Sequence, residues 1–429
     1  MTTVAPTALL ALGALASVVL AAFLLRALPR AAFTAWTLVL FFVPIWVGAN
    51  AGVFWSAITA LTVVLIASQW MWVPLHPADG WMAVFTALLV GLFLMKGVTY
   101  TSMLTAVLEW VIPYTWGRIA CARIGTMWTT RTIALVATAA AGLALLEFVT
   151  SFNPFVLIPG PEPLYSAWDD LQPRGGFLRV EGAFGHSIAL GAALAMSSAF
   201  VIAARWRVIP TIAAIGIIVA ATIVTFSRAG LITLIITIVL SVCLLPGIST
   251  RLRATVAAIG AIGAAVIFPV VDGVLGAAGE EAAVSAGYRT DLLVLIQQVR
   301  LFGSSGDWAS LVQGDFYLGY FARSIDNASM LMLLRYGVIP TLLLLATIAC
   351  AVLLAVRRVG RNPAALAVAG QLPSLVVVAL ITQYGTFLWF CVGLAVAWGS
   401  VRRAASDVAE GSRRQEMPRT EGRRRVLRG

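Results

Sequence analysis

The feature that most constrains this chain is a series of apolar runs, each long enough to cross a lipid bilayer, whose core is about 30 Å thick and needs roughly 20 helical residues. Only 11% of the 429 residues are charged, whereas soluble domains carry about 25%. A water-soluble fold could not cover its surface with so few charges, and a transmembrane β-barrel would alternate apolar and polar residues. The sequence therefore predicts an all-α, polytopic transmembrane helical bundle. Its apolar runs lie near residues 6–25, 31–49, 51–73, 81–98, 99–116, 126–150, 182–204, 208–226, 229–246, 254–271, 326–356, 364–382 and 385–401.

Arginine-rich connections predict which helix ends face the cytoplasm, because basic residues near helix ends are retained on that side. Segments 151–181 and 272–325 are then left outside, and they hold most of the acidic residues. We therefore interpret the net charge of +11 as topology and lipid contact, and expect no nucleic-acid partner. The arginines that share one side, if the helices between them alternate in direction, are Arg118, Arg123, Arg131, Arg205, Arg207, Arg251, Arg253, Arg357, Arg358 and Arg361.

The N-terminal third leaves two span counts open. Placing Arg26 and Arg30 inside gives 13 spans with the N-terminus outside. If residues 99–116 are instead a re-entrant or interfacial helix, the count is 12 with the N-terminus inside. We expect about 12, because Lys96 then also lies on the cytoplasmic side.

The chain is expected to form one membrane domain and a tail. Residues 1–401 make the transmembrane helical domain, including the periplasmic segments 151–181 and 272–325, of which the second is large and partly helical. Residues 402–429 are arginine-rich and lack apolar periodicity. They predict a basic, disordered cytoplasmic tail near anionic lipid head groups.

The polar residues between 174 and 230 are the most informative. Arg228 falls at the outer membrane face in a very short turn after Ser227, where it opposes the positive-inside bias. Ionisable residues at membrane depth are costly and mark functional sites, although Arg228 could instead snorkel or pair with Glu181 to join helices. His186 follows a glycine-containing turn at a helix start. It either helps to bind an anion there or caps the helix.

The outer segment 272–325 contains an apolar stripe that predicts an amphipathic helix over Tyr288–Phe302, lying on the membrane surface or capping the bundle. Arg289 and Arg300 would stand roughly 16 Å apart on this helix, at about 1.5 Å per residue. One anionic group cannot contact both, so we favour Arg289, at the helix N-terminus, as the partner of Arg228.

The segment that closes the outer region contains Ser324, Asp326 and Asn327. Asp326 or Ser324 would make an ordinary helix N-cap. Alternatively, Asp326 faces the same cavity as Arg228 and Arg289, where an acid among arginines stays ionised and can accept a proton from a hydroxyl group.

Together these pieces resemble the O-antigen ligase and polymerase family of bacterial envelope proteins, over about residues 80–401. In that family a segment like Arg-x-x-Gly-x-Phe-Gly precedes a helix pair, and residues 179–185 match it. An outer Ser-Arg-Gly turn is matched by Ser-Arg-Ala at 227–229. A large periplasmic loop, with an arginine-led helix and a glycine-rich turn, is matched by Arg289 and residues 303–306. It closes on His-Asn or Asp-Asn, leucines and a glycine, matched by residues 326–337.

The resemblance implies glycosyl transfer on the periplasmic face of the bacterial inner membrane. The donor would be a glycan on undecaprenyl pyrophosphate and the acceptor a sugar hydroxyl, with no metal or other cofactor. We hypothesise that the catalytic residues are Arg228 and Arg289, on the pyrophosphate, with Asp326 or His186 on the acceptor hydroxyl. Substrate binding is expected for Arg179, Glu181, Ser227, Asn327 and Arg300. Pyrophosphate is already a competent leaving group, so preorganised guanidinium groups supply what the reaction needs.

Lipid-A-directed ligases of the family typically carry a histidine where this chain has Asp326, which favours a polysaccharide polymerase over a ligase. A chain-length regulator and a flippase are then possible partners. A transporter or flippase of anionic glycolipids is the main alternative, although transporters commonly show internal repeats and no such repeat is evident. A non-catalytic subunit of an envelope assembly is the third.

Overall fold

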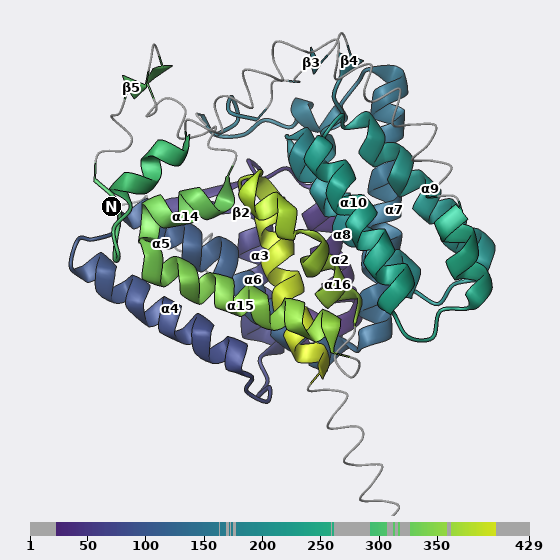
Figure 1. Ribbon diagram of the computed structural model, residues 1–429, viewed down its shortest axis with the longest axis horizontal. Coiled ribbons are helices and arrows are strands. Elements are labelled where there is room, and N and C mark those ends of the chain that lie inside the picture. Colours follow the sequence, from purple (N-terminus) through teal and green to yellow (C-terminus); the bar gives the residue numbers. More distant parts are fainter. Residues whose placement is uncertain are drawn as a thin grey trace, which may run out of the picture.

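The computed structural model describes residues 23–258, 260, 292–306, 312–313, 316–317, 327–357 and 362–399, apart from residues 163, 169–170, 172 and 175–176. The predicted helical class is confirmed, because these residues are mostly helical (Figure 1). The predictions for residues 6–22 and for the tail 402–429 lie outside the described residues. Among the described residues, the α-helices include α2 (Pro29–Phe42), α3 (Ala57–Gln69), α4 (Pro77–Leu94), α5 (Tyr100–Ala106), α6 (Ile112–Ile124), α7 (Thr126–Thr150), α8 (Ser187–Ala203), α9 (Val208–Val224), α10 (Arg228–Leu244), α14 (Ala328–Tyr336), α15 (Val338–Val356) and α16 (Pro363–Gly370).

Short elements connect these helices. The π-helical turn η1 joins α5 to α6, and residues 250–258 and 382–399 are also helical. The 3-10 helices are η2 (Pro154–Leu157), η3 (Gly182–Phe184), η4 (Leu292–Gln298) and η6 (Leu372–Val376), and η1 spans Val107–Val111. Three antiparallel strand pairs are β1 (Gly48–Ala51) with β2 (Val53–Ser56), β3 (Pro173–Arg174) with β4 (Phe177–Leu178), and β5 (Val312–Gln313) with β6 (Phe316–Tyr317).

The first hairpin corrects a prediction. The sequence predicts two helices over 31–49 and 51–73, joined by a tight turn, but β1 and β2 replace the facing ends of both helices. Ala51 pairs with Val53, which leaves Gly52 at the tip with φ 77°. Glycine reaches this left-handed region without steric cost, so the glycine-rich break favours a hairpin.

Helix α8 forms the buried axis of the bundle. All its residues except Ile188 and Ala203 are buried, and most are alanine, glycine or serine. Small side chains let helices approach closely, and α7, α9, α10 and α16 all pack against α8. One close approach joins Gly191 to Gly230 of α10, where a Cβ on Gly230 would lie 3.2 Å from the Gly191 Cα.

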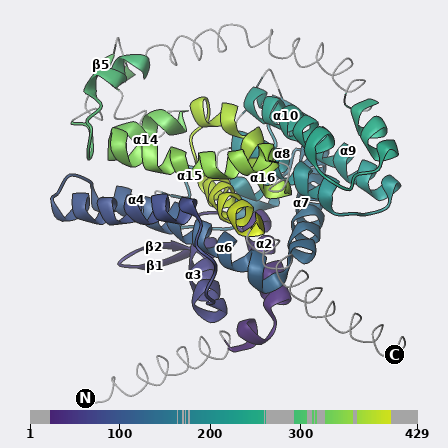
Figure 2. The ribbon, with the colours of Figure 1, turned by 60° about the horizontal axis from the view of Figure 1, so that its bottom comes forward.

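The C-terminal helices lie in the middle of the bundle, between α15 on one side and α8 with α10 on the other (Figures 1 and 2). The predicted continuous span over 364–382 is wrong: α16 ends at Gly370, η6 follows, and residues 377–381 are not helical. Buried side chains hold this break together, since Tyr384 Oη lies 2.7 Å from Ser374 Oγ and 3.1 Å from Gln371 Oε1.

Many arginines gather at one end of the bundle, which we call the basic end. Arg131 Nε donates to the Ala204 carbonyl oxygen (3.0 Å), which links the start of α7 to the end of α8. Arg123 Nε donates to Gln69 Oε1 (3.0 Å) at the end of α3. Arg26 Nη1 donates to the Ser68 carbonyl oxygen (3.0 Å), so Arg26 lies at this end as expected. Arg26, Arg123 and Arg131 therefore lie at one end of the bundle, whereas Arg358 and Arg361 lie outside the described residues.

Lys96 does not lie with these arginines, contrary to our expectation. Asp79 at the start of α4 pairs with Arg118 (2.8 Å) at the basic end, and Lys96 follows the far end of α4, about 27 Å away at ~1.5 Å per residue. Residues 100–124 then return as one uninterrupted helical run, because η1 continues α5 into α6.

Three described helices, α4, α7 and α15, are long and apolar enough to span a membrane, and six other apolar helices have 10–17 residues. The total number of spans stays a prediction. Large apolar side chains are exposed at helical spacing on the flanks of α7 and α10, which is compatible with a membrane protein. They include Leu135, Leu143, Leu146, Val149, Ile232, Ile235 and Val239.

We expect Gly393→Ala to destabilise the protein, because a Cβ at this position would collide with the Tyr114 carbonyl oxygen where helix 382–399 crosses α6. Overpacking of this kind costs about 1–3 kcal/mol. Gly216→Ala in α9 is the matched control, since its Cβ would meet nothing within 4 Å and alanine favours helix. Melting of both variants in detergent tests this, and equal melting temperatures would contradict the packing argument.

Candidate functional site

The two predicted motifs at 179–185 and 227–229 meet at the end opposite to the basic end. Arg179 is buried, and its Nε donates to the carbonyl oxygen of Thr225 (3.0 Å). The next residue, Val180, donates its backbone N–H to the Val224 carbonyl oxygen (3.4 Å). The first motif is therefore docked onto the turn between α9 and α10, immediately before Arg228.

A buried carboxylate on α7, Glu147, organises the first motif. Its Oε1 accepts from the Glu181 backbone N–H (3.0 Å) and from Asn153 Nδ2 (3.1 Å), and its Oε2 accepts from the Gly182 N–H (2.9 Å). Sequence reasoning did not single out Glu147. The feature that could have identified Glu147 is its position as a lone acid in the apolar run 126–150, where an ionisable residue is expected to have a specific partner.

Two glycines shape the turn that follows. Gly182 has φ 54° and Gly185 has φ 60°, in the left-handed region that favours glycine. A Cβ on Gly185 would also lie only 2.7 Å from the Trp46 ring. This turn, which contains η3, ends at His186 and begins α8. The backbone conformation thus explains why the motif has glycine at these two positions.

His186 caps α8, as one of the two interpretations predicts. Its Nδ1 accepts from the Ile188 backbone N–H (3.2 Å), and its ring meets that of Trp168 edge-on at 6.0 Å. Burial, together with the positive charge of Arg179, lowers the pKa of His186 to about 4. The imidazole is therefore neutral at pH 7. Since Nδ1 accepts a hydrogen bond, the proton lies on Nε2, which makes that atom a hydrogen-bond donor.

Arg228 is the first residue of α10 and is exposed. Ser227 caps the helix, with its Oγ accepting from the Gly230 N–H (3.1 Å). Within the described part of the chain the Arg228 guanidinium makes no hydrogen bond or ion pair, so it does not pair with Glu181. A guanidinium at a helix N-terminus places two sources of positive potential side by side, an arrangement that favours an anion.

The predicted helix over Tyr288–Phe302 is wrong over its described residues. Only the 3-10 helix η4 is present, and it ends at Gln298. The backbone carbonyl oxygen of Arg300 accepts from the Val338 N–H (2.9 Å), and the Leu301 carbonyl oxygen accepts from the Ile339 N–H (3.0 Å). Arg300 is therefore anchored at the start of α15 rather than on the docked motifs.

The closing motif begins with Asn327, which is the N-cap of α14. Its Oδ1 accepts from the Met330 N–H (2.9 Å), so the cap is neither Asp326 nor Ser324. The Ala328 N–H donates to the Val378 carbonyl oxygen (3.1 Å), and η6 packs against both α14 and α10. The closing motif is thereby linked to the helix that begins with Arg228.

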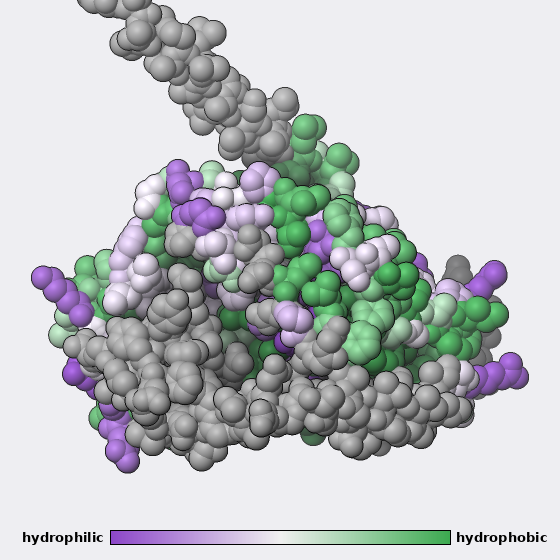
Figure 3. All heavy atoms as spheres, turned by 90° about the horizontal axis from the view of Figure 1, so that it is seen from above, coloured by the Kyte–Doolittle hydropathy of each residue, from purple (hydrophilic) through white to green (hydrophobic). Residues whose placement is uncertain are grey.

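Arg289 and Asp326 lie outside the described residues. Figure 3 looks down on the side of the molecule where β3 and β4 lie, and shows hydrophilic and hydrophobic side chains mixed on its described part. Over the described ranges, no three His, Cys, Asp or Glu side chains are grouped closely enough to hold a metal ion.

No family model matches the chain, and a search of curated proteins finds no matching sequence. The resemblance to the O-antigen ligase and polymerase family therefore rests on the motifs themselves.

We expect Glu147→Gln to loosen the docked motif, because an amide offers one acceptor oxygen where the carboxylate offers two. Leaving a buried backbone N–H without an acceptor costs about 1–3 kcal/mol. The apparent melting temperature should fall, and cleavage of residues 151–186 by added protease should become faster. Glu162→Gln is the control, because Glu162 is exposed in the same segment. Equal effects of the two substitutions would contradict the role of Glu147.

The lowered pKa of His186 predicts an acid-sensitive fold. Stability contributed by the neutral ring is complete above the unfolded pKa of about 6.5 and is lost as the pH falls towards about 4. His186→Asn keeps a good N-cap residue but cannot titrate. We expect melting temperatures measured between pH 7.5 and 4.5 to fall less steeply for this variant than for the natural chain; parallel curves would exclude His186 as the titrating group.

Proposed function

We propose that this protein is a membrane glycosyltransferase of the O-antigen ligase and polymerase type. It would act on a glycan linked to undecaprenyl pyrophosphate, at the periplasmic face of the bacterial inner membrane. The observation that carries the proposal is Arg228. Its exposed guanidinium stands at a helix N-terminus, with no partner in the described part of the chain, at the end away from the arginine-rich connections.

The proposed reaction is a displacement at the anomeric carbon of the donor sugar. An acceptor hydroxyl oxygen forms a bond to that carbon, and the bond from the carbon to the pyrophosphate oxygen breaks. The electron pair leaves with undecaprenyl pyrophosphate, whose negative charge grows in the transition state. Arg228, with Arg289 from outside the described residues, would stabilise this charge. No metal or other cofactor is part of the proposal.

The proton of the acceptor hydroxyl is assigned to Asp326, which also lies outside the described residues. His186 is less suited to accept it, because its Nδ1 is occupied by the Ile188 N–H and its Nε2 carries a proton. We therefore assign His186 the task of donating a hydrogen bond to a sugar or phosphate oxygen. Substrate contacts are proposed for Glu181, Ser227 and Asn327.

The other proposed substrate contacts differ in their support. Arg179 already uses Nε to dock its motif onto Thr225, so its first task is positioning. Arg300 belongs to the loop at the start of α15 and has the weakest support. Asp326 in place of the ligase histidine favours a polymerase, whose acceptor is a growing glycan and whose partners would include a flippase and a chain-length regulator.

A transporter of anionic glycolipids is the second candidate, and one observation favours it. The helical path from α16 breaks at residues 377–381, next to buried Gln371, Ser374 and Tyr384. Interrupted helices with polar side chains are common at transporter binding sites. Release of undecaprenyl pyrophosphate separates the two, because a transporter leaves the donor intact.

We expect Arg228→Ala to lower turnover about 10²–10³-fold, the loss that follows removal of one preorganised charge-stabilising donor. The measurement is release of undecaprenyl pyrophosphate by the purified protein supplied with lipid-linked donor. Arg228→Lys should recover part of the activity, because it keeps the charge but loses the planar fork.

The matched control is Arg251→Ala, which removes an exposed arginine at the basic end. It should keep near-normal turnover. If Arg228→Ala keeps the turnover of the natural chain, the role assigned to Arg228 is wrong. If the natural chain moves the donor across the membrane without cleaving it, the proposed glycosyltransferase function is wrong.

A further inference from the structure

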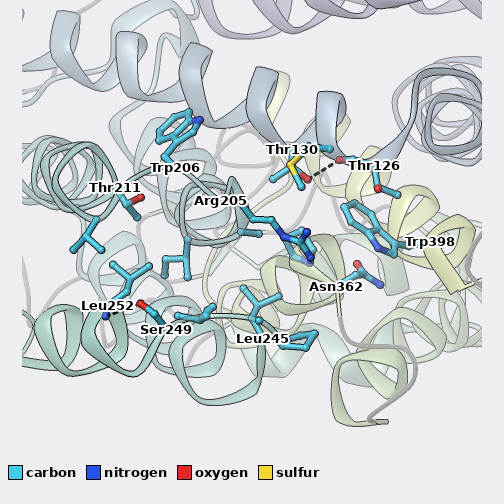
Figure 4. Close-up of a pocket in the computed structure, with 18 residues that line it drawn as sticks. Thr126, Thr130, Arg205, Trp206, Thr211, Leu245, Ser249, Leu252, Asn362 and Trp398 are labelled. Carbon is cyan, nitrogen blue, oxygen red and sulfur yellow. Dashed lines mark hydrogen bonds between the residues drawn. The ribbon is translucent and has the colours of Figure 1, made fainter.

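A cavity of about 680 Å³ lies at the basic end of the bundle (Figure 4). It is separate from the candidate site, which begins at the other end of α8. Neither aspartate nor glutamate lines it. The lining consists of Thr126, Met127, Thr130, Ile202, Ala203, Arg205, Trp206, Val208, Thr211, Leu245, Pro246, Gly247, Ile248, Ser249, Leu252, Asn362, Pro363 and Trp398.

Arg205 supplies the positive charge of this cavity. It follows α8 with φ 54°, a left-handed conformation that residues with a Cβ rarely adopt and that clusters at binding sites. Its Nη2 lies 4.0 Å from the position of a Cβ on Gly247, so the side chain crosses to the turn after α10. Figure 4 shows it reaching into the cavity towards Trp398. To the described residues Arg205 donates no hydrogen bond and forms no ion pair.

Helix ends add to this positive potential. Helices α7, α9, α16 and the helix from residue 250 all begin at the cavity, whereas α8, α10 and helix 382–399, which carries Trp398, reach it with their C-terminal turns. Each helix start carries a partial positive charge and backbone N–H groups without a helical acceptor, and each helix end carries the opposite charge. The starts outnumber the ends, and Arg205 has a full charge, so the cavity favours an anion.

The rest of the lining indicates what kind of anion fits. Trp206 and Trp398 have amphipathic rings of the type that sits at the boundary between lipid and water. Apolar side chains such as Leu245, Ile248 and Leu252 line the same cavity. A ligand that matches this surface has a phosphate group and an apolar portion. A free phosphate ion would leave most of the volume and the apolar lining unused.

We propose that this cavity binds the phosphodiester head group of an anionic phospholipid from the leaflet at the basic end. The phosphate oxygens accept hydrogen bonds from the Arg205 guanidinium and from hydroxyl groups of the lining, and the glycerol and upper acyl carbons lie against the apolar side chains. Arg131 and Arg253 add positive charge nearby, since Arg131 donates to the Ala204 carbonyl oxygen and Arg253 to the Leu245 carbonyl oxygen at the ends of α8 and α10. The proposal is independent of the proposed glycosyl transfer.

The test is lipid binding by the full chain, purified in a neutral detergent. Phosphatidylglycerol and phosphatidylcholine are titrated separately, with native mass spectrometry counting bound lipid and melting temperature as a second readout. We expect phosphatidylglycerol to bind and to raise the melting temperature, and phosphatidylcholine to do neither. Arg205→Gln should weaken this binding about tenfold, the loss of one charge-assisted pair. Arg205→Lys should lose less.

The matched control is Arg207→Gln, which removes an equal charge from the same turn but does not line the cavity. It should bind phosphatidylglycerol nearly as well as the natural chain. Equal binding of both lipids, or equal losses in the Arg205 and Arg207 variants, would overturn the proposal. Glycerol 3-phosphate and inorganic phosphate form the third arm of the experiment. If either raises the melting temperature as much as phosphatidylglycerol does at equal concentration, the ligand is a soluble phosphate and the lipid assignment is wrong.

Discussion

The enclosure of α8 is the constraint on which the rest of the structure depends. A helix surrounded on every side needs small side chains, because neighbours must approach its backbone at several faces at once. The alanines, the serines and Gly191 of residues 187–203 meet this need, and Gly191 lies against Gly230 of α10. Close helix packing, together with the Arg179 hydrogen bond to the Thr225 carbonyl oxygen, therefore positions the start of α10 and Arg228.

Both sites that we propose are at the ends of this one helix. His186 caps its start, beside the docked motif, and Arg205 follows its last turn, inside the cavity at the basic end. A rigid buried helix separates the two by about 25 Å, at ~1.5 Å per residue. Charge at either end is then kept at a constant depth relative to the apolar flanks. This arrangement suits the two sites that we propose, which would bind phosphate groups at opposite surfaces of a bilayer.

Features governed by local chemistry could be predicted from the sequence, and features governed by tertiary contacts could not. The apolar run 126–150 predicted both bounds of α7, and the arginines correctly indicated one end of the bundle. The break after Gly370 depends on the buried Tyr384 hydroxyl, which periodicity does not report. Of the helix expected over 288–302, the described residues 292–302 form only η4, because the Arg300 and Leu301 carbonyl oxygens accept from the start of α15 and are not available to continue a helix.

For the candidate site, the motifs were found but not the group that holds them. Glu147 is remote in sequence from residues 179–186, and no local pattern connects the two. Its carboxylate satisfies two backbone N–H groups and Asn153 at once. Gly182, the first residue of η3, and Gly185, which follows η3, supply the left-handed turns that such a close approach requires. The conformational entropy of this turn is lost when the protein folds, so it is not lost again each time a ligand binds. Electrostatic stabilisation of a leaving group depends on charges that do not reorganise as the reaction proceeds. In the proposed reaction the buried acid would contribute without touching substrate, by keeping the turn, His186 and the α9–α10 corner in one arrangement around Arg228.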